Sequence, residues 1–317
     1  MSALLEVRGL SKHYRTGAGV LRALEAVSFD LAAGEVLGVV GESGCGKSTL
    51  GRTLLRLVPA PAGEVRFEGE DIMRLGARAL VRRRRDMQIV FQDPFGSLNP
   101  RHRVATLIGE PLVIHGVPGV RARVAELLDL VGLPPDSGAR YAHEFSGGQR
   151  QRIAIARALA LAPKLLVADE PVSALDVSIQ SQIINLIVDL KRRLGLAMLF
   201  ISHDISVVRH VSDRIAVMYL GRIVELGLAA AVLAAPAHPY TRALLSAVPP
   251  VPGEAKRDRI VLQGDPPDPA DPPPGCAFHL RCGAARPDCA TVRPDLVTRR
   301  LPDGGLRETA CHLHEAA

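Results

Sequence analysis

The sequence lacks a long apolar segment and a recognisable leader, and each absence excludes a class of protein. No stretch approaches the roughly 20 consecutive apolar residues that a membrane-spanning helix requires. The most apolar run, residues 226–237, stops at His238 and Pro239. The N-terminus MSALLEVRGL has no basic start followed by an apolar run, which is the pattern of a secretory signal. We therefore expect a protein that neither crosses a membrane by itself nor is secreted.

Lysine is scarce, so arginine supplies nearly all of the positive charge. The chain has 39 Lys+Arg against 33 Asp+Glu, a formal net charge of +6, and only Lys12, Lys47, Lys164, Lys191 and Lys256 are lysines. This charge permits contact with anionic lipid or nucleic acid but does not demand it. The densest basic patch, residues 82–85, is typical of a solvated helix face. With 47% hydrophobic and 23% charged residues, the composition is that of a globular protein.

Cysteine is also rare, but its distribution is uneven. Cys45 stands alone, whereas the other four lie in the last 42 residues: Cys276, Cys282, Cys289 and Cys311. Without an export signal, four clustered thiols indicate a metal site rather than disulfides.

Short apolar runs alternate with amphipathic segments between residue 1 and about 235. The runs 36–40, 165–168 and 197–201 have the length of buried strands. Apolar residues spaced by three and four indicate one helix face: Ile179, Ile183, Leu186, Leu190 and Leu194. This alternation predicts an α/β sheet. The strand-like segments 4–7 and 26–31 predict an added antiparallel layer.

Helical patterns replace strand patterns from 101 to 145, which indicates a helical insertion into the sheet domain. From residue 248 onward prolines interrupt every candidate element. We interpret this stretch as a linker leading to the small cysteine-bearing tail.

A phosphate-binding loop follows the first apolar strand. The segment Gly41-Glu42-Ser43-Gly44-Cys45-Gly46-Lys47-Ser48 fits G-x-x-x-x-G-K-[ST], and Thr49 leads into a helical pattern over 50–57. The glycines let backbone N–H groups surround a phosphate at a helix N-terminus. We expect Lys47 to reach the β- and γ-phosphates of ATP and the Ser48 hydroxyl to bind Mg²⁺.

A second strand, 165–168, ends in two carboxylates, Asp169 and Glu170. Alone, such a pair is usually a solvated strand end. Downstream of a phosphate loop, Asp169 is placed to hold Mg²⁺ and Glu170 to act as general base on the attacking water.

The remaining motifs resemble those of ABC-type ATPases, in family order. Ser146-Gly147-Gly148-Gln149 resembles the family signature, with Phe145 in place of its leading leucine. The other matches are Gln92 (the Q-loop), Asp176 (the D-loop), His203 (the H-loop) and Tyr14 (the aromatic that stacks on adenine). The resemblance covers at least residues 4–228.

This resemblance implies that two ATPases sandwich two ATP molecules, each site using one chain's phosphate loop and the other chain's signature. It further implies that Gln92 touches both Mg²⁺ and the coupling surface. His203 would contact the γ-phosphate, and Asp176 would link the two sites. The implied fold is a RecA-like core with an N-terminal antiparallel β layer, a helical subdomain and a small cysteine-bearing extension.

Three further stretches resemble the oligopeptide/dipeptide importers within that family. They are the extended Q-loop 92–100, the signature segment 143–152, and the segment 238–245, which resembles the group's characteristic helix after the core. The cysteine tail also resembles the group's C-terminal extension, although Leu280 replaces a proline common in the group. The chain is more similar to the second of the two paired ATPases. The resemblance implies two membrane permeases, a second homologous ATPase forming a heterodimer, and an extracytoplasmic peptide-binding protein, with no nucleic acid. It places the protein peripherally on the cytoplasmic face of the bacterial inner membrane.

We accordingly predict three parts. Residues 1–100 and 147–235 form the ATPase core, residues 101–146 the helical signature subdomain, and residues 236–317 the C-terminal extension.

The spacing of the four tail cysteines, C-x₅-C-x₆-C-x₂₁-C, lacks the close pair that is usual for structural zinc. Four thiolates can equally hold a [4Fe–4S] cluster, and the resembled family can carry one here. We therefore favour Fe–S over Zn²⁺. The alternative to a metal site is that the four cysteines are free thiols.

Two other functions stay open. One is import of nickel or another small solute by the same machinery, because substrate choice resides in the binding protein and permeases. The other is a soluble ABC ATPase acting on nucleic acid or ribosomes, favoured only by the charge of +6.

Overall fold

The computed structural model describes residues 3–17, 19–248, 258–301 and 306–314. The chain divides into two compact units. The first unit comprises residues 1–4, 32–35 and 74–201, and the second comprises residues 5–31, 36–73 and 202–317. This division by contacts does not follow the three predicted functional parts, whose boundaries therefore stay a prediction.

The first unit contains a parallel sheet covered by helices. Its strands are β6 (Met87–Val90), β7 (Leu165–Asp169) and β8 (Ala197–Ser202), with β7 paired in parallel to both neighbours. Every residue of β7 and β8 is buried. Strands buried on both faces are continuous apolar runs, which is why the sequence already indicated these two.

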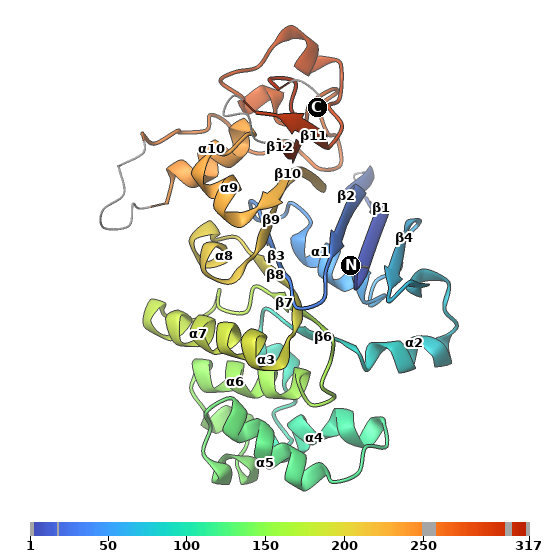
Figure 1. Ribbon diagram of the computed structural model, residues 1–317, viewed down its shortest axis with the longest axis vertical. Helices are drawn as coiled ribbons and strands as arrows, with labels where there is room; N and C mark the ends of the chain where they lie inside the picture. The colour runs from blue at the N-terminus through green and yellow to red at the C-terminus, as the bar shows by residue number, and fades with distance from the viewer. Residues whose placement is uncertain (1–2, 18, 249–257, 302–305, 315–317) are drawn as a thin grey trace. The chain divides into compact units, whose positions relative to one another are not determined.

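In the first unit, α7 (Val177–Leu194), α6 (Gly147–Ala158) and α5 (Val120–Leu130) lie in successive layers, and α2 (Ala77–Arg84) lies to the right of them (Figure 1). This unit also contains α3 (Pro94–Ser97) and α4 (Val104–Ile114), with the 3₁₀ turns η2 (Pro135–Ala139) and η3 (Ala142–Glu144). Helices α4, α5 and α6 pack against one another, and α6 also packs on α7. The helical insertion predicted over 101–145 is therefore present.

Helix α7 confirms the predicted helix but shifts its buried face. Its buried residues are Ile183, Ile187 and Leu190, whereas Leu194 is 47% exposed. The α-helical repeat of 3.6 residues carries the buried stripe from 183 through 187 to 190, and Leu194 lies at the helix end.

The second unit begins with an antiparallel sheet in the order β2-β1-β4-β5. Its strands are β1 (Leu5–Thr16), β2 (Gly19–Leu31), β4 (Ala62–Phe67) and β5 (Glu70–Asp71). Leu5 is opposite Leu31 on one side and Phe67 on the other. The predicted antiparallel layer is confirmed, although β1 and β2 are much longer than the apolar segments that indicated them.

A second set of strands in this unit runs in the order β11-β12-β10-β9-β3. It comprises β3 (Val36–Val40), β9 (Arg214–Tyr219), β10 (Arg222–Leu228), β11 (Val297–Arg300) and β12 (Leu306–Thr309). Only the β3–β9 pair is parallel. The fold is thus an α/β cassette with a separate antiparallel layer, as expected.

The remaining elements of the second unit are short. They are α1 (Lys47–Leu54), η1 (Ile72–Arg74), α8 (Ile205–Val211), α9 (Ala229–Ala234), α10 (Pro239–Ser246), η4 (His279–Arg281) and η5 (Pro287–Ala290). Helix α10 confirms the helix expected over 238–245. Part of the expected proline-rich linker, residues 249–257, lies outside the described residues. No helix in the described ranges combines the length and apolarity needed to span a membrane.

Candidate functional site

The phosphate loop connects the buried strand β3 to helix α1. Gly46 has a left-handed backbone with φ of 103°, and a Cβ there would lie 2.2 Å from the carbonyl oxygen of Ala23. Only glycine suits both constraints. Gly41 is constrained by space alone, since a Cβ would meet the carbonyl oxygen of Met218 at 2.2 Å. The loop therefore has the shape that lets its N–H groups face a phosphate at the N-terminus of α1.

Lys47 is buried and its ammonium group is held by the loop itself. Its Nζ donates hydrogen bonds to the carbonyl oxygens of Gly41 at 2.9 Å and Glu42 at 3.0 Å. Ser48 and Thr49 follow in the first turn of α1, while Ser43 and Gly44 are exposed. The locations of these loop residues agree with the phosphate-loop motif. The role of each residue in binding phosphate stays a prediction.

Cys45 contributes to the loop through its backbone rather than through its thiol. Burial raises the pKa of its thiol to about 11, so it stays protonated at neutral pH and is a poor nucleophile. Its carbonyl oxygen accepts a hydrogen bond from the N–H of Gly221 at 2.9 Å, which joins the β9–β10 turn to the loop.

Two side chains from the C-terminal region support the same loop. The Tyr240 hydroxyl accepts a hydrogen bond from the N–H of Glu42 at 2.8 Å. Arg281 donates to both carboxylate oxygens of Glu42, at 2.9 and 3.1 Å. This hydrogen bonding raises the pKa of Arg281 above its usual range. Sequence reasoning missed both contacts, because nothing local in 238–245 or 275–282 indicates a partner so far away in the chain.

Tyr240 also belongs to an aromatic cluster centred on Phe278. Phe278 packs against Tyr219, Tyr240 and His238, with ring centroids 5.3, 5.4 and 5.7 Å apart. His238 is fully buried, and burial lowers its pKa to about 3. It therefore stays neutral and accepts the N–H of Tyr240 at Nδ1, capping α10.

The acidic half of the predicted site lies in the first unit. Strand β7 ends at the buried Asp169, and Glu170 then adopts a left-handed backbone with φ of 46°. Such a conformation is unusual for a residue other than glycine and is often found at functional sites. The Gln92 amide Nε2 donates to Glu170 Oε2 at 3.2 Å. The structure thus brings together two residues that the motifs had assigned to water activation and Mg²⁺.

The signature begins α6. Ser146 is its N-cap and forms a capping box with Gln149, each accepting the other's backbone N–H. An added Cβ on Gly148 would lie 2.4 Å from Cγ2 of Ile179 on α7. Gly148 is therefore needed for helix packing as well as for the predicted phosphate contact.

The D-loop lies beside the signature within the first unit. An added Cβ on Gly147 would meet Leu175 Cδ2 at 3.2 Å, and Leu175 directly precedes Asp176. Asp176, Ser146 and Gln149 are all exposed, and Val177 is 79% exposed.

His203 and Tyr14, the two other residues predicted to contact the nucleotide, belong to the second unit. His203 is exposed directly before Asp204, which caps α8 by accepting the N–H of Ser206 at 2.8 Å. Tyr14 lies on β1, and the Lys12 ammonium stands 4.6 Å from the centroid of its ring. Stacking of adenine on Tyr14 stays a prediction.

The proposed Mg²⁺ donors have suitable chemistry. Ser48, Gln92 and Asp169 offer hydroxyl, amide and carboxylate oxygens, and Mg²⁺ is bound through oxygen. Ser48 belongs to the second unit, and Gln92 and Asp169 belong to the first.

The four tail cysteines converge on one small cavity. Cys276, Cys282, Cys289 and Cys311 line it together with His238, His279 and His312. The Cys276 N–H donates to the carbonyl oxygen of Cys289 at 2.8 Å. All four thiols are free. Within the described ranges, no three Cys, His, Asp or Glu side chains stand in an arrangement that already fits a metal ion.

Known proteins match nearly the whole chain. The family described as ABC transporter matches residues 24–173, and the family described as oligopeptide/dipeptide transporter, C-terminal region, matches residues 224–289. A putative peptide import ATP-binding protein of Brucella ovis is 56% identical over 92% of this chain and 93% of that protein. The oligopeptide transport ATP-binding protein AppF of Bacillus subtilis is 51% identical over 98% and 97% of the two chains.

Two solved structures share the cassette fold at 30% identity. One is a dimeric post-hydrolysis state of the ATP-binding cassette MJ0796 bound to ADP and Pi, with a TM-score of 0.65 over 71% of this chain and 98% of that chain. The other is CbiO1 from Clostridium perfringens, part of the transporter complex CbiONQ, with a TM-score of 0.67 over 74% and 92%.

Proposed function

Because this chain belongs to the ATP-binding proteins of the oligopeptide/dipeptide ABC transporters, we propose that it hydrolyses ATP to power import of di- and oligopeptides across the bacterial inner membrane. The observation that carries the proposal is the contact of the C-terminal region with the phosphate loop, through Tyr240 and Arg281 on Glu42. The segment that distinguishes this family therefore contacts the phosphate loop directly.

The chemistry is transfer of the γ-phosphoryl group to water. The phosphate loop and Lys47 neutralise the phosphates. Ser48, Gln92 and Asp169 would hold Mg²⁺ through their oxygens, and the ion would balance the charge that develops during transfer. Glu170 accepts the proton of the attacking water, and the hydrogen bond from Gln92 fixes its carboxylate. His203 contacts the γ-phosphate.

We place the partner ATPase at the surface formed by Ser146, Gln149 and Asp176, so that the signature of one subunit completes the site of the other. This requires a second, homologous subunit. The exposed positions of these residues and of Val177 support the placement.

We place the permease at an apolar groove between α4 and α5 in the first unit. The groove is lined by Gly109, Val113, Ile114 and Val124, among others, and Val113 and Ile114 are 67% and 69% exposed. An apolar face of this kind suits a short amphipathic helix. The assembly would hold the protein at the cytoplasmic face of the membrane, with two permeases and an extracytoplasmic binding protein.

For the cysteine cavity we propose a [4Fe–4S] cluster held by Cys276, Cys282, Cys289 and Cys311, with Zn²⁺ as the alternative. Four thiolates are the ligand set that both groups accept, and convergence of four cysteines on one cavity supports the assignment. A tail with so little apolar core would gain folding energy from the bound group.

The deciding experiment is uptake into proteoliposomes that contain this chain, its permeases and partner ATPase, and the binding protein. Import of labelled dipeptide that requires ATP and is lost in Lys47→Ala supports the proposal. Nickel uptake without peptide uptake would instead support the metal-import alternative. A chain that stays unbound by the permeases but binds RNA would contradict both.

A further inference from the structure

Helix α2 and the residues beside it carry most of the net charge of the chain. The segment 74–86 holds Arg74, Arg78 and the arginine run 82–85 against a single carboxylate, Asp86. It therefore accounts for +5 of the formal net charge of +6. Helix α2 lies to the right of the layered helices of the first unit (Figure 1). It packs on β6, whose residues carry no charge.

Three of these arginines and a valine form one exposed face of α2. Arg78 and Arg82 are four positions apart, and Val81 and Arg85 repeat that interval, so the four side chains lie on one side of the helix. Arg85 is the C-cap residue and keeps a helical backbone. The three arginines are exposed and Val81 is 49% exposed, whereas Leu80 is buried. We call these four residues the α2 basic face.

The fold does not neutralise this face. In the described ranges, the guanidinium groups of Arg78, Arg82 and Arg85 make no ion pair or side-chain hydrogen bond. Asp86, the carboxylate of the same segment, pairs with Arg83 at 4.0 Å. The charge of the α2 basic face is therefore available to a partner outside the chain.

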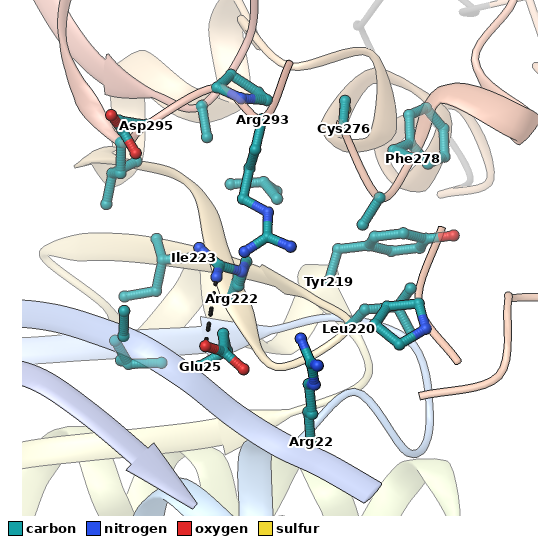
Figure 2. Close-up of a pocket in the computed structure, with 18 of the residues that line it drawn as sticks. Arg22, Glu25, Tyr219, Leu220, Arg222, Ile223, Cys276, Phe278, Arg293 and Asp295 are labelled. Carbon is teal, nitrogen blue, oxygen red and sulfur yellow. Dashed lines mark ion pairs between the residues drawn. The ribbon is translucent and has the colours of Figure 1, made fainter. Parts of the chain in front are cut away.

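The arginine cluster of the second unit shows the opposite arrangement (Figure 2). The cavity drawn there is lined by as many carboxylates as arginines: Arg22, Arg222, Arg293, Glu25, Asp295 and Glu308. Glu25 pairs with Arg222 at 3.6 Å. The charges around that cavity balance within the fold, which distinguishes it from the α2 basic face.

The stability of α2 explains only part of its charge. Cations are favourable in the last turn of a helix and unfavourable in the first, because the helix macrodipole is positive at the N-terminus. The run 82–84 occupies the last turn, but Arg78 is the second residue of the helix, and the first turn contains no acidic residue. Arg78 extends the positive face against the local electrostatics of the helix, which indicates a role outside it.

We propose that the α2 basic face binds the anionic phospholipid headgroups of the membrane on which the transporter works, which rests on the proposed function for the presence of that membrane. An anionic leaflet attracts a cluster of basic residues beside it, by about fivefold in binding for each side chain. Planar guanidinium groups bind phosphate oxygens in pairs. Val81 lies among the arginines, and such a mixture is typical of helices that rest in the headgroup region.

Nucleic acid is the competing polyanion. Sites for single strands combine a basic groove with aromatic side chains on which the bases stack. Side chains of asparagine and glutamine are common readers of base edges in duplexes. The segment 74–86 contains no aromatic residue, asparagine or glutamine. Its composition therefore favours a lipid surface.

The test is co-sedimentation of the full chain with vesicles. We expect binding to mixed phosphatidylglycerol and phosphatidylcholine, little binding to phosphatidylcholine alone, and weaker binding at high salt. The triple variant Arg78→Ala, Arg82→Ala, Arg85→Ala should bind about a hundredfold more weakly, because three contributions of about fivefold multiply. The corresponding triple lysine variant should retain most of the affinity, since the attraction depends on charge.

The last turn of α7 supplies the matched control. It contains Lys191, Arg192 and Arg193, so their triple alanine variant removes the same charge from another helix of the same unit. This control should bind vesicles as the parent does. The substituted arginines of α2 are exposed, so equal melting temperatures of variants and parent will show that the fold is intact.

Four results would overturn the proposal. They are a parent without preference for anionic vesicles, unchanged binding in the α2 triple alanine variant, an equal loss in the α7 control, and displacement of the vesicles by a single-stranded RNA oligonucleotide at equal phosphate concentration. The last result would assign the face to nucleic acid. Vesicle binding is measured without the permeases, so its failure leaves the uptake experiment intact, and failure of uptake leaves the vesicle result valid.

Discussion

At the scale of single residues, Glu170 has the most constrained position in the acidic half of the site. Its backbone is left-handed, with φ of 46°, and Gln92 donates a hydrogen bond to its carboxylate through Nε2. Strain of this kind costs about 1–3 kcal/mol and persists only where the surroundings enforce it. The conformation therefore supports a chemical role rather than a solvated strand end.

We predict that Glu170→Gln retains ATP binding but lowers turnover by about 10²–10⁴, the usual contribution of a general base. The amide keeps the size of the side chain but cannot accept the proton of water. Single-turnover hydrolysis and equilibrium ATP binding measure the two effects separately. Glu126→Gln is the control, because Glu126 is an exposed carboxylate of the same unit that pairs with Arg123. Unchanged turnover in Glu170→Gln would remove this residue from the base role.

The motifs locate these residues on strand ends and helix starts because the spacing along the chain fixes their order, and the roles assigned to them stay predictions. The motifs assigned Gln92 and Glu170 to the same nucleotide site, but the hydrogen bond between them appears only in the structure. The contact of Arg281 could not be predicted either, since its partner Glu42 is 239 positions away and no pattern around either residue records the contact. The second role of Gly148, its packing against Ile179, likewise appears only in three dimensions.

At the scale of elements, buried strands were the easiest to predict. Strands β3, β7 and β8 are buried along their whole length, and their apolar runs show it directly. The β1–β2 hairpin extends well beyond its apolar segments because its outer part is exposed and polar, and cross-strand pairing sustains it. Packing of α10 and η4 on the phosphate loop joins elements that are distant in sequence, so it leaves no local signal.

The contact of η4 with the phosphate loop predicts that Arg281→Ala raises the KM for ATP about tenfold and changes kcat less. The Arg281 side chain is 8% exposed and that of Glu42 is 26% exposed, so removal leaves a poorly solvated carboxylate beside the loop. Lost hydrogen bonds to charged groups cost about 1.5–3 kcal/mol. Steady-state ATPase kinetics report the split between KM and kcat.

Two further variants distinguish positioning from general destabilisation. Exchange of the charges, Glu42→Arg with Arg281→Glu, should restore part of the affinity that either single change removes. Arg286→Ala, in the same extension, should leave the KM unchanged. If Arg281→Ala lowers kcat and thermal stability but not ATP affinity, the contact supports the fold and does not position the loop.

At the scale of the whole molecule, one chain carries a phosphate loop and a signature that resemblance assigns to different nucleotide sites. Ser146, Gln149 and Asp176 are exposed and the apolar α4–α5 groove lies in the same unit, and these are the surfaces that we propose for other subunits. In the second unit the cysteine cavity adjoins the aromatic cluster, since Phe278 and His238 line the one and form the other. Folding of the tail and support of the phosphate loop are therefore coupled through shared side chains.

This coupling makes the metal content of the tail the most informative property of the intact protein. We predict that anaerobically purified protein is brown and contains about four iron and four sulfide per chain. Cys289→Ser should lose the iron and the colour and lower the melting temperature, because metal ligation contributes folding energy. Cys45→Ser is the control and should keep its iron, since Cys45 lies in the phosphate loop. About one zinc per chain without colour would assign the cavity to a structural zinc, and protein without metal would refute a metal site altogether.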